Sequence, residues 1–108
     1  MDFRCIKVRL HEGQRERAIG WMRGFGSRAD EAMEAMRHNG LRHEAVFLGS
    51  DDRGDYLLMV QASDDFAATT RAFLQSELPI DREALAALGE IGQRGQELEL
   101  LVQLDADR

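Results

Sequence analysis

Two hydrophobic periodicities follow one another along the chain, and their order limits the fold to a small set of architectures. Short segments with alternating or clustered apolar residues predict strands over residues 3–10, 42–49, 55–62 and 96–104. The intervals after the first and third segments repeat their apolar residues every three or four positions, which predicts helices. The order β-α-β-β-α-β predicts an α+β, ferredoxin-like fold, in which a four-stranded antiparallel sheet carries its helices on one face.

Glycine and short polar residues mark the ends of these elements. The polar segment 50–54, which ends in glycine, predicts a turn that joins the second and third strands in a hairpin. The first helical interval is expected to end at Asn39 and Gly40, and to bend or break within residues 24–26, where two glycines occur. Three side chains are predicted to cap the starts of later helical segments: Ser27, Ser63 and Asp81.

Length, charge and cysteine content narrow the class of protein. At 108 residues the chain is predicted to be one domain, residues 1–108, that is long enough to bury a core. Its start lacks the pattern of a signal peptide, and its apolar runs are too short to span a membrane. The single cysteine, Cys5, fits a reducing compartment, and the net charge of −6 argues against nucleic-acid binding. We therefore expect a cytoplasmic protein without membrane or nucleic-acid partners.

The sheet face turned away from the helices is expected to mix apolar and charged residues. Arg9 and Glu99 have the parity of this face on strands that neighbour each other in a ferredoxin-like sheet, and Glu44 joins them if its strand turns Val46 and Leu48 the same way. A second subunit that covers the face would shield its apolar residues, so a homodimer is expected. The charges then have two interpretations: a salt-bridge network that fixes the dimer, or a polar cavity that orients a small-molecule ligand, with Glu44 or Glu99 as a proton acceptor of raised pKa.

Other chemistry-bearing residues indicate no metal, cofactor or nucleophile site. His11 lies at a strand end, His38 lies in the last turn of a helix, and His43 and Glu44 point to opposite faces of a strand, so they do not form a metal site. The glycines near Phe25 lack the spacing of a dinucleotide fingerprint. Lys7 could favour the thiolate of Cys5, but a small apolar side chain that fills a strand is the simpler interpretation. Trp21 lies on the apolar stripe of the first helix and is predicted to anchor the core rather than to bind a ligand.

Several short motifs, taken in order, resemble an uncharacterised bacterial family of unknown function within the dimeric α/β-barrel superfamily of ferredoxin-like proteins. They span nearly the whole chain: Trp21-Met22, Asp30-Glu31, Glu44-Ala45-Val46-Phe47, Asp55-Tyr56-Leu57, Ser76, Pro79-Ile80-Asp81 and Leu98-Glu99-Leu100-Leu101. The resemblance implies a dimeric barrel. It also implies a histidine shortly after the Ile-Asp pair, where this chain has Ala84, so no role that needs this histidine is expected here.

Fold and resemblance leave the function open, because the superfamily includes cofactor-free monooxygenases, haem-degrading enzymes and stress-response proteins. The first hypothesis is a dimeric domain that binds a small molecule or a partner, with Arg9, Glu44 and Glu99 as ligand-binding candidates. The alternative is a cofactor-free monooxygenase- or isomerase-like enzyme that uses the same cavity. A purely structural partner protein is the third hypothesis.

Overall fold

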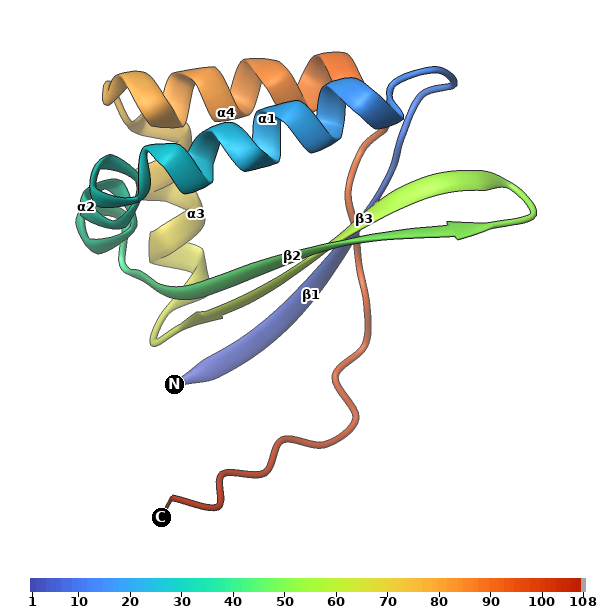
Figure 1. Cartoon of the computed structure of the whole chain (residues 1–108). Helices are drawn as coiled ribbons and strands as arrows, with labels where there is room; N and C mark the ends of the chain where they lie inside the picture. The colour runs from blue at the N-terminus through green and yellow to red at the C-terminus, as the bar shows by residue number, and fades with distance from the viewer. Residues whose placement is uncertain (108) are drawn as a thin grey trace.

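Strands and helices follow one another in the expected order along the described part of the chain. The structure, a computed structural model, describes residues 1–107. Its elements are β1 (Asp2–Arg9), α1 (Arg15–Ser27), α2 (Ala29–Asn39), β2 (Leu41–Asp51), β3 (Gly54–Ser63), α3 (Phe66–Gln75), α4 (Pro79–Ile91) and β4 (Gln96–Glu97). The strands form one antiparallel sheet in the order β2-β3-β1-β4, and the helices lie on one face of it (Figure 1). This arrangement confirms the predicted α+β, ferredoxin-like fold.

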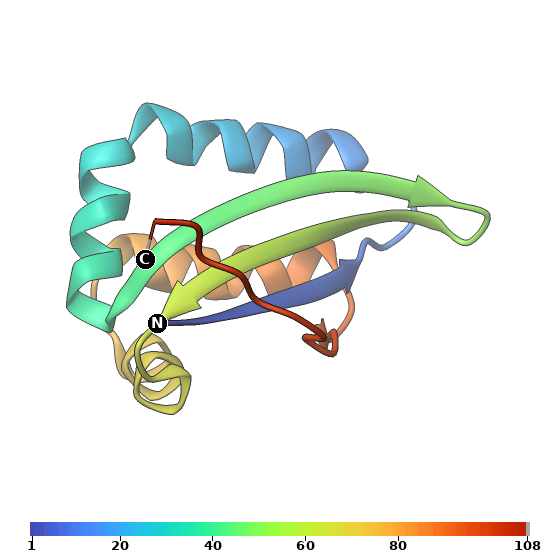
Figure 2. The same cartoon turned by 90° about the horizontal axis from the view of Figure 1, so that it is seen from below.

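The alternation of side chains along the strands defines an inner face, which meets the helices, and an outer face, which does not. Val8 pairs with Leu57 across β1 and β3, and Leu57 pairs with Leu48 of β2, so these three side chains lie on the inner face. A core cluster joins inner-face residues to α1 and α4: Val8, Leu10, Ala18, Leu57 and Ile91. Seen from below, the outer face of the sheet lies in front of the helices and is crossed by the C-terminal segment (Figure 2).

Two glycines are needed where helices end. Gly40 follows α2 with a φ of +81°, in the left-handed region that glycine adopts without strain, as the predicted end of this helix requires. Gly92 follows α4, where an added Cβ would lie only 2.5 Å from a methyl carbon of Val8. The end of α4 therefore approaches β1 more closely than any side chain would permit.

The predicted break in the first helical interval is present, but it falls at Arg28, just after the two glycines. Ser27 does not cap α2, because its hydroxyl donates a hydrogen bond to the carbonyl of Gly24 at 2.7 Å. The serine thus belongs to the last turn of α1. The prediction that Ser27 caps the second segment is wrong.

The other two predicted caps are also replaced by neighbours. Asp65, not Ser63, caps α3, because its carboxylate accepts a hydrogen bond from the backbone N–H of Ala68. Ser63 is instead buried, and its hydroxyl bonds to that of Thr69 at 2.7 Å. Likewise α4 begins at Pro79, whose fixed φ suits the first helical position, so Asp81 lies inside the first turn.

The last strand is much shorter than predicted. Only Gln96 and Glu97 pair with β1, and the backbone N–H of Leu98 donates one further hydrogen bond to the carbonyl of Cys5. Residues 98–104, here called the C-terminal arm, then leave the sheet (Figure 1). The predicted strand over residues 96–104 is therefore wrong beyond Glu97. The alternating apolar pattern indicated an extended backbone, but it could not show which edge, if any, that backbone pairs with.

No helix within residues 1–107 combines the length and the apolar character that crossing a lipid bilayer demands.

Candidate functional site

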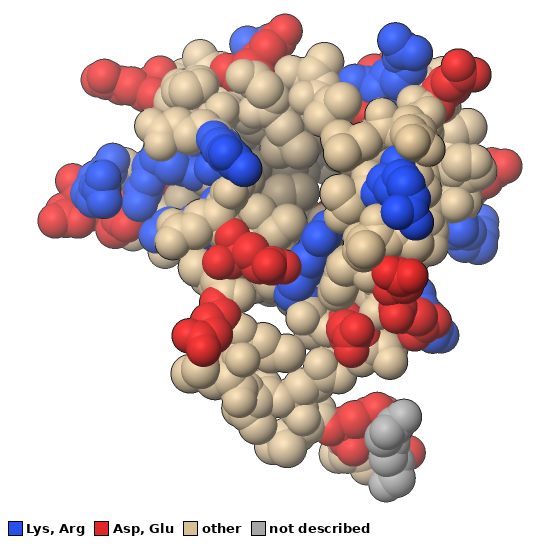
Figure 3. Space-filling model, turned by 180° about the vertical axis from the view of Figure 1, so that it is seen from behind, with Lys and Arg blue, Asp and Glu red and all other residues tan. Residues whose placement is uncertain are grey.

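A cavity of about 940 Å³ lies between the inner face of the sheet and the helices. Figure 3 shows the molecule from behind, with a hollow whose walls are mostly uncharged. The sequence leaves this space open because the helices turn small residues toward it: Ala29, Ala32, Ala84 and Gly89. The volume lies in the range of about 300–1,000 Å³ that is typical of small-molecule sites.

Large apolar side chains form most of the cavity wall. Trp21 and Phe25 of α1 meet edge to face, with ring centroids 4.8 Å apart, and Phe73 and Leu88 line other parts of the space. Trp21 also packs against the core cluster, as predicted. The structure adds that the same side chain lines the cavity, so its role is not limited to packing.

One row of polar side chains crosses the inner face of the sheet. Arg4 of β1, Gln61 of β3 and Glu44 of β2 are cross-strand neighbours. The guanidinium Nε of Arg4 donates to Oε1 of Gln61 at 2.8 Å, and Nε2 of Gln61 donates to Oε2 of Glu44 at 2.5 Å. All three residues line the cavity. The row thus fixes one carboxylate oxygen of Glu44 and leaves Oε1 without a hydrogen-bond donor among residues 1–107.

Contacts with α3 hold Arg4 at the start of this row. Its guanidinium carbon lies 4.3 Å from the centroid of the Phe66 ring, and Nη1 donates to the hydroxyl of Thr70 at 3.3 Å. Burial lowers the pKa of Arg4, while the negative charges of Glu97 and Glu44 act in the opposite direction. The arginine is therefore a positioned cation at the edge of an apolar cavity.

Glu44 lies in an environment that disfavours its charge. The side chain keeps access to solvent through the open cavity, yet the protein atoms around it displace enough water to raise its pKa. The hydrogen bond from Gln61 and the charge of Arg4 lower the pKa and offset only part of this effect. A carboxyl group of this kind takes up a proton more readily than a solvated one.

A second polar pair lies elsewhere in the cavity wall. Asn39, the last residue of α2, donates from Nδ2 to Oδ2 of Asp81 in α4 at 2.8 Å, and both side chains are buried. Ala84 lines the cavity one turn further along α4. The resemblance implied a histidine near that position, so the cavity lacks an imidazole there.

The structure does not bring the three predicted site residues together. Glu44 has the parity of Val46 and Leu48, which pair with Met59 and Leu57 on the inner face, so Glu44 cannot share the outer face with Arg9. Glu99 lies in the exposed C-terminal arm because the strand that was to carry it ends at Glu97. The predicted constellation is therefore wrong, and of its members only Glu44 lines the cavity.

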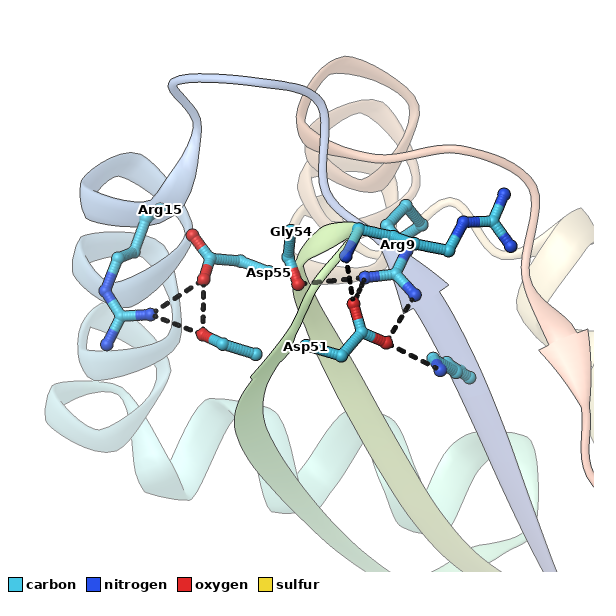
Figure 4. Close-up of polar contacts among 8 residues, drawn as sticks. Arg9, Arg15, Asp51, Gly54 and Asp55 are labelled. Carbon is cyan, nitrogen blue, oxygen red and sulfur yellow. Dashed lines mark hydrogen bonds and ion pairs between the residues drawn. The ribbon is translucent and has the colours of Figure 1, made fainter.

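Arg9 pairs with Asp51 at the far end of β2 instead of with Glu99. Two nitrogens of its guanidinium bond both oxygens of Asp51, at 2.9 and 3.0 Å, and Lys7 lies 3.7 Å from the same carboxylate. The pKa of Asp51 falls to about 2, and the largest cause is the hydrogen bonding from Arg9. The charge of Lys7 adds to this effect. In Figure 4 Asp51 faces Arg9, while Asp55 faces Arg15 of α1. The hairpin end is thus tied to two neighbouring elements by surface ion pairs.

Arg4 and Gln61 were missed in the sequence. Arg4 has the parity of Ile6 and Val8, which form an apolar row on the face that meets the helices. A charged residue in that apolar row was the available signal, since a charge facing the helices needs a partner. No such signal identified Gln61 as the residue that links it to Glu44.

The described part of the chain contains no group of side chains that could hold a metal ion. Within residues 1–107 no three side chains among His, Cys, Asp and Glu lie close enough together to hold an ion. The groups that line the cavity are instead suited to hydrogen bonding and to proton transfer at Glu44.

Comparison with known proteins agrees with this fold. The structure is similar to that of L-rhamnose mutarotase from Formosa agariphila, with a TM-score of 0.62 and 16% sequence identity over 97% of this chain and 100% of the other. At that identity the likeness concerns the fold alone. Curated protein sequences give no match. A family model described as "Family of unknown function (DUF6176)" matches residues 1–108. The chain belongs to this family, as the predicted resemblance to a family of unknown function implied.

Proposed function

We propose that the protein binds a small organic molecule in the inner cavity, with a mostly apolar skeleton and a hydroxyl group that bonds to Glu44. The observation that carries the proposal is the row Arg4–Gln61–Glu44, which presents one oriented carboxylate in a cavity of about 940 Å³ whose wall is mostly apolar. The second polar pair of the wall, Asn39 and Asp81, already forms its own hydrogen bond. An oriented acceptor among mostly apolar walls suits a ligand with a single polar end.

The polar groups of the cavity also limit the ligand class. A free sugar presents hydroxyl groups on every side and needs many hydrogen-bonding partners, whereas aromatic and aliphatic side chains such as Trp21, Phe73 and Leu88 form most of this wall. An anionic group beside the ionised carboxylate of Glu44 would be repelled by it, and the mostly apolar wall would not compensate for its lost hydration. We therefore expect an uncharged ring system that carries a hydroxyl group.

The test uses two probes that differ only in that group, 2-naphthol and naphthalene. We expect both to bind, detected by magnetisation transfer from protein to ligand, with 2-naphthol about tenfold tighter, the factor that 1.4 kcal/mol of hydrogen bonding would give. Glu44→Leu should remove this preference and leave naphthalene binding unchanged. Leu74→Ala, at an exposed position of α3 outside the cavity, is the matched control.

Binding of neither probe to the wild-type protein would refute the proposal. A preference for 2-naphthol that survives Glu44→Leu would place the ligand elsewhere and refute the role of Glu44. If the variant loses both probes equally, circular dichroism shows whether it is still folded, and loss of both by a folded variant would also contradict the expected result.

An isomerase-like enzyme is the second candidate, because Glu44 combines a raised pKa with an oxygen open to the cavity. The fold neighbour is a mutarotase that acts on L-rhamnose, so exchange between the anomers of L-rhamnose, measured by NMR, is a direct assay. If the protein only binds its ligand, the anomers of L-rhamnose should exchange no faster with the protein than in solvent alone. Acceleration that Glu44→Gln abolishes would establish the enzyme instead.

We also propose that two copies pair through the outer face of the sheet, in the cytoplasm. The helices cover only the inner face, and Phe47 on the outer face of β2 is 57% exposed. An apolar sheet face that the chain does not cover is typical of an interface between copies. Arg9 lies on this face and stays a candidate for contacts between subunits, as does Glu99 in the arm.

A further inference from the structure

Arg4 and Glu44 carry opposite charges at the two ends of the polar row, yet they do not bond to each other within the described residues. The amide of Gln61 lies between them, accepting from Nε of Arg4 at 2.8 Å and donating to Oε2 of Glu44 at 2.5 Å. A guanidinium and a carboxylate make their strongest contact when they pair directly through two hydrogen bonds. Because the amide prevents that pairing, each charged group keeps a polar atom that the protein does not use.

Each unused atom lies beside the atom that bonds to Gln61. Nε and Nη2 of an arginine share one edge of the planar guanidinium, with parallel N–H bonds. Nε of Arg4 donates to Gln61 and Nη1 donates to Thr70, whereas Nη2 has no acceptor among residues 1–107. Oε1 of Glu44 is the matching free acceptor. The row therefore presents one free donor and one free acceptor, on two side chains that both line the cavity.

Gln61 itself shows which chemical group fits between these two atoms. Its side-chain amide is an O–C–N unit that accepts a hydrogen bond on oxygen and donates one from nitrogen. A second unit of this kind, lying alongside Gln61, would accept from Nη2 of Arg4 and donate to Oε1 of Glu44. A lactam is a ring that contains this unit, and its tautomer carries a hydroxyl group beside a ring nitrogen. Either tautomer has a donor and an acceptor on one edge.

We infer that the ligand of the inner cavity is a planar ring with a hydrogen-bond donor and an acceptor side by side on one edge, as in a lactam or its hydroxyl tautomer. This inference rests on the proposed binding of a ring that donates to Glu44, and it adds Arg4 as a residue that determines specificity. The opposite charges of the two residues suit an edge that is polar but neutral. The remainder of the ring contacts apolar side chains such as Trp21 and Phe73, which line the same cavity.

The test compares three probes of similar size: 2-quinolone, 4-quinolone and 2-naphthol. 2-Quinolone has its N–H beside its carbonyl, whereas its isomer 4-quinolone has the same two groups on opposite sides of the ring. Titrations would follow the indole N–H signal of Trp21, the single tryptophan of the chain, which lines the cavity. We expect 2-quinolone to bind about tenfold more tightly than either of the others, the gain that one further hydrogen bond gives.

Arg4→Met removes the guanidinium and keeps an apolar side chain at its position. It should weaken the binding of 2-quinolone about tenfold, to the level of 2-naphthol, because the second hydrogen bond is lost. The affinity for 2-naphthol, which uses only Glu44, should stay within about twofold of wild type. Leu74→Ala, on α3 and outside the cavity, is the matched control and should keep the preference for 2-quinolone.

Equal affinities of the wild-type protein for the two quinolones would overturn the inference. So would a preference for 2-quinolone that survives in a folded Arg4→Met variant. In both cases, binding of 2-naphthol that depends on Glu44 would leave the proposed function in place, whereas failure of all three probes to bind would overturn both. The two quinolones are compared on the wild-type protein, so this comparison decides the matter even if Arg4→Met does not fold.

Discussion

Glu44 and Asp51 belong to the same strand, yet their environments shift their pKa values in opposite directions. Glu44 faces the inner cavity, where burial raises the pKa of its carboxyl group. Asp51 lies at the end of β2 beside Arg9, which lowers the pKa of its carboxyl group to about 2. Each carboxylate accepts hydrogen bonds, so the difference comes from the water that remains around it and from the charge of its nearest donor. A neutral amide from Gln61 does not offset burial, whereas a bidentate guanidinium lowers the pKa outright.

The same contrast separates the two faces of the sheet. On the inner face, polar groups form one connected row, and Gln61 at its centre is buried, so water cannot readily replace the two hydrogen bonds that it makes. On the outer face, Arg9 and Lys7 share Asp51, and water can replace any of the three. Losing one member of the inner row should therefore cost more than losing one member of the outer group.

The largest effect is expected from Gln61→Leu. Gln61 is 8% exposed and is the only link between Arg4 and Glu44 in the row, so leucine would remove the partner of Arg4 Nε and of Glu44 Oε2 at a buried position. We expect the free energy of unfolding to fall by about 1–3 kcal/mol, the cost of unsatisfied polar groups. The pKa of Glu44 should rise further, because the hydrogen bond that lowers it is gone. Urea denaturation and carbon NMR of the carboxyl group measure the two changes.

Arg9→Met is the outer-face comparison for this variant. It removes the bidentate partner of Asp51 but leaves that carboxylate in water, with Lys7 still close to it. Its loss of stability should be clearly smaller than that of Gln61→Leu. Equal losses would mean that the inner row is as well hydrated as the outer pair, and the contrast between the faces would fail.

The fold was predictable because the elements depend on local periodicity. The hairpin of β2 and β3 and the end of α2 at Gly40 follow from patterns within a few residues, and the structure confirms them. Helix caps were less predictable, since Ser63 and Asp65 are equally good cap residues and only tertiary packing, which buries Ser63 against Thr69, selects between them. The prediction of a strand over residues 96–104 failed beyond Glu97 for a different reason, because strand pairing is not a local property.

The candidate site was predictable only in part. Glu44 was identified as a candidate proton acceptor of raised pKa, and its pKa is raised, but it was assigned to the wrong face. A strand whose residues 44–48 read Glu-Ala-Val-Phe-Leu has apolar side chains on both faces, so its parity does not reveal which face meets the helices. The cavity itself was not predictable, because alanines and glycines on a helix indicate close packing as readily as they indicate empty space.

The smallest effects, and the sharpest contrast in sign, are expected in the pH dependence of stability. For Asp51 the folded chain binds its proton less tightly than the unfolded chain does, since the pKa falls from 3.8 to about 2 on folding. The ionised carboxylate therefore stabilises the fold above about pH 4, and this contribution is lost as the pH falls from 3.8 toward 2. The stability that wild type has over Asp51→Asn should shrink across that interval, measured by urea denaturation at each pH.

Glu44 should give the opposite slope. Its pKa is raised above 4.5 on folding, so the folded chain binds this proton more tightly and gains stability from the protonated form at low pH. That gain is lost as the pH rises through 4.5 toward the raised value, because the charge must then be held where burial disfavours it. Glu44→Gln keeps an oxygen that accepts from Gln61 and removes the charge, so at pH 7 it should be at least as stable as wild type, whereas Asp51→Asn should be less stable. If both variants lost stability at pH 7 and regained it in acid, the two carboxylates would share one kind of environment. The face of the sheet would then not decide their protonation.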